Sequence, residues 1–484
     1  MDNNKSLGSK ARSGLGWNLF GNFLKQFFTV VVSILIARIL GPEDYGVVAI
    51  ALIFVSFSQI FVDVGFTEGI IQKQGISDVA LSSVFYFNLV VSSVLAVLIY
   101  FLAPAIGHYF ENERVIEVIE YLVLILPIAA LGKVHSAILT KEIRFKSLSI
   151  RDIFSALIGG AIGIFAAYSG FGVYSLVWQQ IGATLSATIL LWIGSKWLPK
   201  FEFSWQELKE LLSFSTFVFF DTLLQQVFNK LDTIFVGKAF SPTILGLYAR
   251  ADSLRGLIND FSTNSLSKII YPIFSLLQSD LEKFKSVFVK SVGAIIVLSC
   301  FLCGLLFFSA EFIIITLLGE KWRQSIVFFQ ILIFSTISLP LRAVIFKAIL
   351  GMGYSRIKFK LGLMNNLLKI GSIPVGYYFG IEAFAWMVVA GRYVIVLVSW
   401  RVFYSLVKFN IVEVLKPILL PIAVLFFWTI FYYMKIIDLN MLWYLLPFLL
   451  TFFTLLIITK NFGLQFITNE VKGLNKRRKK KKIQ

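Results

Sequence analysis

The sequence has few of the residues on which most metal and catalytic sites depend. Its 484 residues include two histidines, His108 and His135, and two cysteines, Cys300 and Cys303, at no spacing that a zinc site uses. The Cys-x-x-Cys pair lies in an apolar run, where packing is the expected role. The chain has no phosphate-binding Gly-x-x-x-x-Gly-Lys-Ser/Thr loop, no Asp-x-Asp pair and no Gly-x-Ser-x-Gly elbow. Nothing therefore supports an ATPase or another enzyme, and no catalytic or metal site is expected.

Charge is also scarce, and apolar residues are abundant. Charged residues make up 15% of the chain and hydrophobic residues 58%, with a mean hydropathy of +0.82. A soluble domain carries about 25% charged residues and has too little core volume for so many apolar side chains. The formal net charge is nevertheless +18. This balance predicts an all-α integral membrane protein with basic cytoplasmic loops.

Apolar runs of about 20 residues, the length of a membrane-spanning helix, recur along the chain. Ile153–Ser195 lacks Asp, Glu, Lys and Arg and is broken by Ser169-Gly170-Phe171-Gly172, which predicts two helices joined by a tight turn. We predict fourteen spans, which start near Gly16, Asp44, Ala80, Val115, Arg151, Val173, Ser213, Leu245, Ser286, Gln324, Lys358, Glu382, Val412 and Leu439.

The distribution of Lys and Arg predicts the orientation of these spans. With the amino terminus inside, the inside segments hold 29 of these residues and the outside loops hold six. The positive-inside rule therefore places both termini in the cytoplasm. No signal peptide is expected, because Met1–Arg12 is polar and basic.

An internal repeat relates the two halves of the chain. Gly16–Ala49 and Thr216–Ala249, at an offset of 200, share eight of 34 residues, including Pro42/Pro242 and Gly46/Gly246, and Arg38 aligns with Lys238. A second stretch recurs at an offset of 208, for example Trp178/Trp386. Two hydrophobic chains can match by chance, but Pro, Gly and Trp are uncommon here. The repeat predicts two six-helix lobes related by a pseudo-two-fold axis along the membrane normal, an arrangement known in secondary transporters.

The repeat also predicts the domain boundaries. Residues 1–205 form the N-terminal lobe with spans 1–6, and residues 206–410 form the C-terminal lobe with spans 7–12. Residues 411–460 add two helices, and residues 461–484 form a basic cytoplasmic tail. The run Lys476–Lys482 in this tail fits contact with anionic lipid headgroups or a solvated topology signal; no nucleic-acid partner is expected.

Polar residues at helical spacing lie inside the first two predicted spans of each lobe. Asn18, Asn22 and Lys25 form one such stripe, and Asp252 and Arg255 belong to another. Polar groups in a membrane are costly, so they face a cavity or one another. Asp252–Arg255 is an i,i+3 pair, which favours mutual pairing for single residues, whereas the whole set favours a mostly cationic cavity for an anionic substrate. The predicted cavity residues are Asn18, Asn22, Lys25, Gln59, Asp63, Asp221, Gln225, Asn229, Arg250, Asp252, Arg255, Asn259, Arg342, Lys369 and Arg392.

Several short motifs carry a family resemblance. Ile36–Gly46, with the sequence Ile-Ala-Arg-Ile-Leu-Gly-Pro-Glu-Asp-Tyr-Gly, resembles the start of the polysaccharide-export flippases of the multidrug/oligosaccharidyl-lipid/polysaccharide (MOP) superfamily, of the Wzx and teichuronic-acid-export types. The resemblance covers about residues 10–410. Further matching motifs are Asp63–Phe66, Arg144–Lys146, Asn229–Asp232, Gly237-Lys238, Leu245–Tyr248, Tyr271-Pro272 and Gly319–Trp322.

This resemblance implies a V-shaped, MATE-like fold in a bacterial inner membrane. It also implies flipping of undecaprenyl-diphosphate-linked oligosaccharide units by alternating access, for O-antigen, capsule, exopolysaccharide or teichuronic acid assembly. The first lobe offers Lys25 as its clear mid-span cation, so anion binding would rest mainly on the second lobe. The implied partners are the lipid-linked oligosaccharide and the polysaccharide polymerase and assembly proteins. No cofactor is implied, and coupling to H⁺ or Na⁺ stays open.

Two other functions stay open at this point. A cation-coupled multidrug exporter of the same superfamily would need an acidic cavity, for which Asp63, Asp221 and Asp252 are candidates. A membrane-embedded polymerase or glycosyltransferase would rely on large outer loops, and the predicted outer loops are short.

Overall fold

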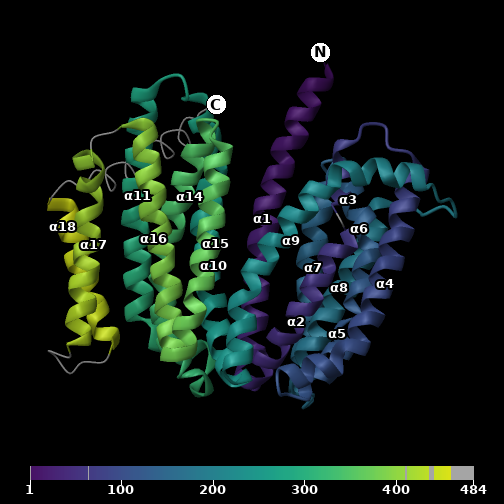
Figure 1. The fold of residues 1–484 in the computed structure, drawn as a ribbon, viewed down its shortest axis with the longest axis horizontal. Helices are drawn as coiled ribbons and strands as arrows, with labels where there is room; N and C mark the ends of the chain where they lie inside the picture. Colours follow the sequence, from purple (N-terminus) through teal and green to yellow (C-terminus); the bar gives the residue numbers. More distant parts are fainter. Residues whose placement is uncertain (1, 64, 409–410, 435–440, 459–484) are drawn as a thin grey trace, which may run out of the picture. The chain divides into compact units, whose positions relative to one another are not determined.

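The computed structural model describes residues 2–63, 65–408, 411–434 and 441–458, and every element in this part of the chain is helical (Figure 1). Side chains are described for most of these residues; those of 2–15, 18–19, 63, 213–218, 220–221, 258–272, 411, 413–416, 441–442 and 458 are outside the description. The helical state follows from the apolar surroundings, because a spanning helix satisfies its backbone hydrogen bonds within itself.

The chain divides into two compact units, each described here by itself. Unit 1 consists of Met1–Ala249 and Leu317–Lys321. Its helices are α1 (Asp2–Ile39), α2 (Pro42–Asp63), α3 (Phe66–Gln72), α4 (Asp78–Tyr109), α5 (Arg114–Leu122), α6 (Ile125–Lys141), α7 (Phe145–Tyr168), α8 (Tyr174–Ser195), α9 (Trp205–Ala239) and the start of α10 (Pro242–Leu276).

Unit 2 consists of Arg250–Thr316 and Trp322–Gln484. Its helices are the rest of α10, α11 (Leu281–Phe308), α12 (Ala310–Leu318), the short η1 (Glu320–Trp322), α13 (Ser325–Ile333), α14 (Ser335–Gly351), α15 (Ser355–Phe379), α16 (Ile381–Val407), α17 (Ile411–Tyr433), η2 (Met441–Tyr444) and α18 (Leu445–Ile458). The predicted boundary at residues 205/206 stays a prediction, and the predicted basic tail lies outside the described residues.

Nine helical segments of the described residues are long and apolar enough to cross a membrane, which identifies a multi-span membrane protein. They are α1, α2–α3, α4, α5–α6, α7, α8, α11, α13–α14 and α16. Helices α9, α10 and α15 have 35, 35 and 25 residues, but they carry more charge, whereas the apolar parts of α17 and α18 are shorter. The finer count of fourteen spans stays a prediction, and its last start, Leu439, is outside the described residues.

The predicted turn between the fifth and sixth spans is confirmed. Helix α7 ends at Tyr168 and α8 begins at Tyr174. Gly170 and Gly172 between them have φ angles of +82° and +54°, a left-handed conformation that glycine adopts without steric cost. The two helices therefore pack side by side, and α7 also packs against α1.

A buried aromatic cluster joins α4, α6, α8 and the segment before α9 in unit 1. The His135 ring is fully buried and lies 4.6 Å from the Trp192 ring and 5.3 Å from the Trp197 ring, measured between centroids. Its Nδ1 atom lies 2.7 Å from Ser195 Oγ. His135 is thus a packing residue, and Cys300 and Cys303 are likewise buried, as expected of the Cys-x-x-Cys pair.

Charged residues fasten the start of α9 to the segment that follows α3. Lys73 Nζ lies 2.8 Å from Glu210 Oε2 and 3.2 Å from Glu207 Oε2. These hydrogen bonds to Glu210 and Glu207 raise the pKa of Lys73 above its ordinary value. The ammonium group is charged at neutral pH and pairs with both carboxylates.

The two Pro-x-x-x-Gly turns of the repeat meet each other within unit 1. A Cβ atom at Gly46 would lie 1.8 Å from the carbonyl oxygen of Pro242, and a Cβ atom at Gly246 would lie 1.8 Å from that of Pro42. Such reciprocity, in which equivalent residues exchange contacts, is what a local two-fold axis produces. The close approach of α2 and α10 at this point requires glycine in both turns.

Gly46→Ala or Gly246→Ala is expected to destabilise the protein by about 1–3 kcal/mol, because the added methyl group must displace backbone. The measurement is the thermal unfolding midpoint of the purified protein in detergent. Gly41→Ala is the matched control in the same turn, since nothing lies within 4 Å of its Cβ position. Equal midpoints for the Gly46 and Gly41 variants would contradict the close contact.

Candidate functional site

A basic cluster in unit 2 gathers predicted cavity residues from four helices. It consists of Asp252 and Arg255 on α10, Arg342 on α14, Lys369 on α15 and Arg392 on α16. Arg255 donates to Asp252 Oδ1 from Nε at 2.8 Å and from Nη2 at 2.7 Å. Arg255 is 7% exposed, whereas the Asp252 side chain is 40% exposed. Lys369 and Arg392 also lie close enough to act electrostatically on Asp252.

An amide and an aromatic ring lie beside Arg342 of the cluster. Arg342 donates a hydrogen bond from Nη1 to Asn365 Oδ1, and its guanidinium carbon lies 5.7 Å from the centre of the Phe346 ring. Arg342 is also near enough to Arg392 for their charges to interact. Helices α14, α15 and α16 pack against one another, so the scaffold that carries three of the cations is continuous.

The composition of the basic cluster determines which ligand it can bind. The cluster holds four cations and one carboxylate, so it has a net positive charge. Cations outside water are costly unless an anion approaches them, and guanidinium groups suit phosphate through bidentate contacts. The Asp252–Arg255 ion pair agrees with the expected mutual pairing, but it neutralises only one of the cations. The cluster is therefore suited to an anion such as a phosphate or diphosphate.

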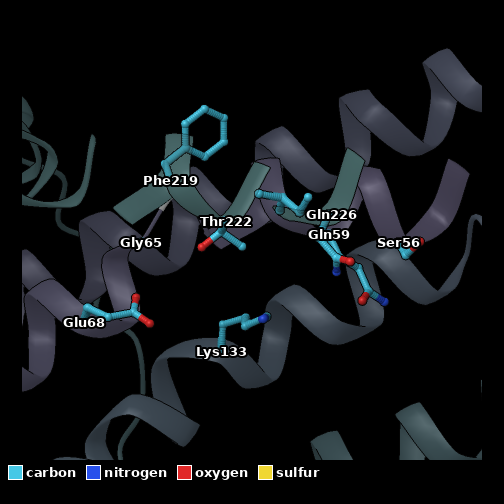
Figure 2. A pocket seen from close by; sticks show the side chains of 9 residues that line it. Ser56, Gln59, Gly65, Glu68, Lys133, Phe219, Thr222 and Gln226 are labelled. Carbon is cyan, nitrogen blue, oxygen red and sulfur yellow. The ribbon is translucent and has the colours of Figure 1, made fainter. Parts of the chain in front are cut away.

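A second polar site, the polar pocket, lies in unit 1. It is a cavity of about 200 Å³ between α2, α3, α6 and α9 (Figure 2). Its uncharged polar lining residues are Ser56, Gln59, Thr222 and Gln226.

Two charged residues and an aromatic ring complete the lining of the polar pocket. Figure 2 shows Glu68 and Lys133 on one side, opposite Phe219 and Thr222 of α9. One carboxylate and one ammonium group leave the lining with no net formal charge. The polar pocket thus differs in chemistry from the basic cluster.

Several predicted cavity residues lie apart from both sites. In α1, Lys25 is 3.8 Å from the Asp152 carboxylate, which also binds Arg151. Gln225 and Asn229 are exposed on α9 but do not line the polar pocket, and Asn22 is exposed on α1. Arg250 is buried at the start of unit 2. The side chains of Asn18, Asp63, Asp221 and Asn259, and of the motif Tyr271-Pro272, lie outside the described residues.

Two charged residues of the polar pocket, Glu68 and Lys133, are absent from the predicted set of cavity residues. Lys133 is a mid-span cation of the apolar segment Arg114–Lys141, and Glu68 lies in α3. The first half of the chain therefore offers a cation besides Lys25, where the sequence analysis counted Lys25 alone. The available signal was the position of Lys133 deep within an apolar span. Among the described residues, no three His, Cys, Asp or Glu side chains lie together as a metal site would require.

A third feature, the cross-repeat clasp, joins helix ends in unit 1. Arg38 Nε donates to the carbonyl oxygen of Leu317 at 3.0 Å, and Lys238 Nζ donates to that of Tyr109 at 2.6 Å. Lys238 also binds Glu111 at 2.8 Å. Arg38 and Lys238 are 200 residues apart, and the two carbonyls are 208 apart, which are the two offsets of the repeat. Each repeat thus caps a helix end of the other.

Lys238 also changes the pKa of its partner, Glu111. Its hydrogen bond and charge lower the pKa of Glu111, which lies in the loop after α4. A further cation, Lys321, donates to the carbonyl oxygen of Ile39 at 3.1 Å. All these contacts lie at the end of unit 1 that the predicted topology places outside.

Comparison with known proteins gives this geometry a context. The family model described as "Polysaccharide biosynthesis protein" matches residues 35–327. The chain is 23% identical over 394 residues to the succinoglycan biosynthesis transport protein ExoT of Rhizobium meliloti (strain 1021), covering 80% of this chain and 79% of that protein. It is 23% identical over 330 residues to the teichuronic acid biosynthesis protein TuaB of Bacillus subtilis (strain 168), covering 68% of each.

Solved structures agree on the fold. The lipid II flippase MurJ in an inward closed conformation matches with a TM-score of 0.67 at 18% identity, over 94% of this chain and 99% of that one. An inward-facing MATE-family multidrug transporter of the MOP superfamily matches with a TM-score of 0.63 at 14% identity, over 79% of this chain and 94% of that one. The homologues are transporters, not enzymes. The chain belongs to the polysaccharide biosynthesis protein family of the MOP superfamily, with the MurJ/MATE-like fold.

Proposed function

We propose that this protein flips undecaprenyl-diphosphate-linked oligosaccharide units from the cytoplasmic to the outer leaflet of a bacterial inner membrane. The products would serve the assembly of a surface polysaccharide such as O-antigen, capsule, exopolysaccharide or teichuronic acid. The observation that carries the proposal is the basic cluster of unit 2, which holds four cations and one carboxylate. A diphosphate supplies the negative charge that this composition favours.

The names of two relatives agree with a role in the transport of polysaccharide units. One is called a succinoglycan biosynthesis transport protein and one a teichuronic acid biosynthesis protein. A polysaccharide unit is too polar to cross the hydrocarbon core unaided, so a protein must provide a polar route. In the proposed mechanism the basic cluster holds the diphosphate while the lipid chain stays in the bilayer.

The cross-repeat clasp supports alternating access. With both termini in the cytoplasm, the Arg38, Lys238 and Glu111 contacts lie at the outer end of the helices. Release of a substrate to the outer leaflet would then require these contacts to break. Contacts between polar atoms at an aqueous end are weak enough to break reversibly, because water can replace each partner.

The chemistry of the basic cluster disfavours the multidrug-exporter alternative. A cavity for cationic drugs needs an available carboxylate, and Asp252 is held by Arg255 at 2.7 Å among further cations. The other two acidic candidates, Asp63 and Asp221, have side chains outside the described residues. The polymerase alternative is disfavoured because the homologues are transporters.

Lys369→Ala is expected to reduce polysaccharide export about ten-fold or more, because one charged hydrogen bond contributes about 1.5–3 kcal/mol. Arg255→Ala should reduce export as well, and Lys369→Arg should retain most of it. The measurement is surface polysaccharide in a deletion strain that carries each variant at matched protein levels. Arg356→Ala, an exposed cation in the first turn of α15, is the control. Unchanged export for both alanine variants in the cluster would contradict the assignment.

A cross-link across the cross-repeat clasp is expected to stop export, because opening the outer end would be prevented. The pair Lys238→Cys/Glu111→Cys replaces a 2.8 Å ion pair, and a short cleavable bis-maleimide can bridge it. Export should stop on cross-linking and return when the linker is cleaved. Cys300 and Cys303 are buried and should not react.

The control for this experiment is a pair within the first repeat at the same end of the helices. Arg114 binds Glu43 at 3.1 Å, so Arg114→Cys/Glu43→Cys can be cross-linked by the same reagent. Export should survive that cross-link. Full export through a completely cross-linked Lys238→Cys/Glu111→Cys protein would show that the outer end does not open during transport.

A further inference from the structure

We propose that the polar pocket of unit 1 binds one sugar ring of the transported oligosaccharide. The inference rests on the proposed function and adds a second binding site to it. The basic cluster would hold the diphosphate, and the polar pocket would hold a neutral saccharide ring. The two sites belong to different units and share no residues.

The lining groups match the chemistry of a sugar hydroxyl. The carboxamides of Gln59 and Gln226 each provide donors and an acceptor, and the hydroxyls of Ser56 and Thr222 can do both. Every sugar hydroxyl is likewise a donor and an acceptor. A lining of this kind can satisfy several neighbouring hydroxyls at once, whereas a metal ion or an apolar ligand would leave these groups unsatisfied.

The net formal charge of the polar pocket favours a neutral sugar over a phosphate. Glu68 provides acceptors and Lys133 provides donors, and their formal charges cancel. A phosphate gains from a net positive site, which the basic cluster offers and this pocket does not. A neutral polyol can use both charged groups as strong hydrogen-bond partners.

The remaining lining and the size of the polar pocket fit a ring. Ile60 and Phe219 supply the apolar part of the lining, and the Phe219 ring packs edge-to-face against the Phe61 ring at 5.3 Å between centroids. The cavity of about 200 Å³ is below the ~300–1,000 Å³ of pockets for drug-sized ligands. It can therefore enclose a single ring rather than a whole repeat unit.

The position of these groups in the chain argues for a function. Gln59 lies in the span Pro42–Gln72 and Lys133 in the span Arg114–Lys141, both among the apolar segments of the chain. A charged or amide side chain inside a span is costly and marks a pathway or a binding site. Packing alone would be served better by Leu or Met at either position.

A photo-crosslinking experiment tests where the sugar lies. A benzophenone amino acid replaces Phe219, and the cell's own lipid-linked oligosaccharide is labelled with a tritiated hexose. Irradiation should transfer label to the protein. The same amino acid at Phe101 on α4, which is 75% exposed, should take up no label. A third variant carries it at Phe346, beside Arg342 in the basic cluster.

The three positions distinguish this inference from the proposed function. Label at Phe219 supports the sugar site. Label at Phe346 without label at Phe219 overturns the sugar site and leaves the proposed function intact. No label at Phe219 or Phe346 in cells whose export continues contradicts both.

Substitution of the carboxamide provides a second test. Gln226→Leu should reduce export about three- to ten-fold, the usual effect of one lost hydrogen bond. Its binding of geranylgeranyl diphosphate, a probe without sugar, should not change. Gln180→Leu, an exposed glutamine of α8, is the matched control. Unchanged export, or an equal loss of affinity for the sugar-free diphosphate, would overturn a specific role in sugar binding.

Discussion

The cost of placing polar groups in hydrocarbon is the constraint on which the rest of this structure depends. Backbone groups meet it by forming helices, since every described element is helical. Helix ends leave carbonyl oxygens without partners, and Arg38 and Lys238 donate to two of them. Ionised side chains meet the same constraint by pairing, as the buried Arg255 does with Asp252. The composition of each group of polar side chains then determines which ligand it can bind.

The two proposed sites bind chemically different parts of the substrate. The basic cluster has more cations than carboxylates and is suited to phosphate. The polar pocket has no net formal charge and a lining of amides and hydroxyls, which is suited to a sugar. A transporter that binds both the diphosphate and the sugar would distinguish a lipid-linked saccharide from a phospholipid and from a free sugar. Specificity of this kind depends on polar groups that a wrong ligand leaves unsatisfied.

Much of the fold follows from patterns that sequence alone reveals. Apolar run length identified a multi-span helical membrane protein, and Ser169–Gly172 identified a tight turn that the structure contains. The offset of 200 aligned Arg38 with Lys238 and Gly46 with Gly246, and the structure pairs these positions reciprocally. Such features are local or periodic, so they can be predicted without knowing how the helices pack.

The candidate site was harder to predict, for a geometric reason. A polar stripe shows which residues share a helix face, but not which face meets a neighbouring helix. On α9 the predicted Gln225 and Asn229 do not line the polar pocket. Thr222 and Gln226 do, and each lies one position after a predicted residue, Asp221 and Gln225 respectively. Lys133 was missed because the sequence does not show that α6 and α9 line the same pocket. By contrast Gln59, Lys369 and Arg392 were predicted, since charge or amides inside a span are informative by themselves.

The most direct test of the central claim is a comparison of ligands that differ only in the head group. Geranylgeranyl diphosphate and geranylgeraniol have the same lipid chain, so their affinities for the purified protein in lipid nanodiscs isolate the contribution of the diphosphate. A net positive basic cluster predicts that the diphosphate binds about ten-fold tighter or more. Equal affinities, or preferential binding of a lipophilic cation such as tetraphenylphosphonium, would contradict diphosphate recognition by this protein.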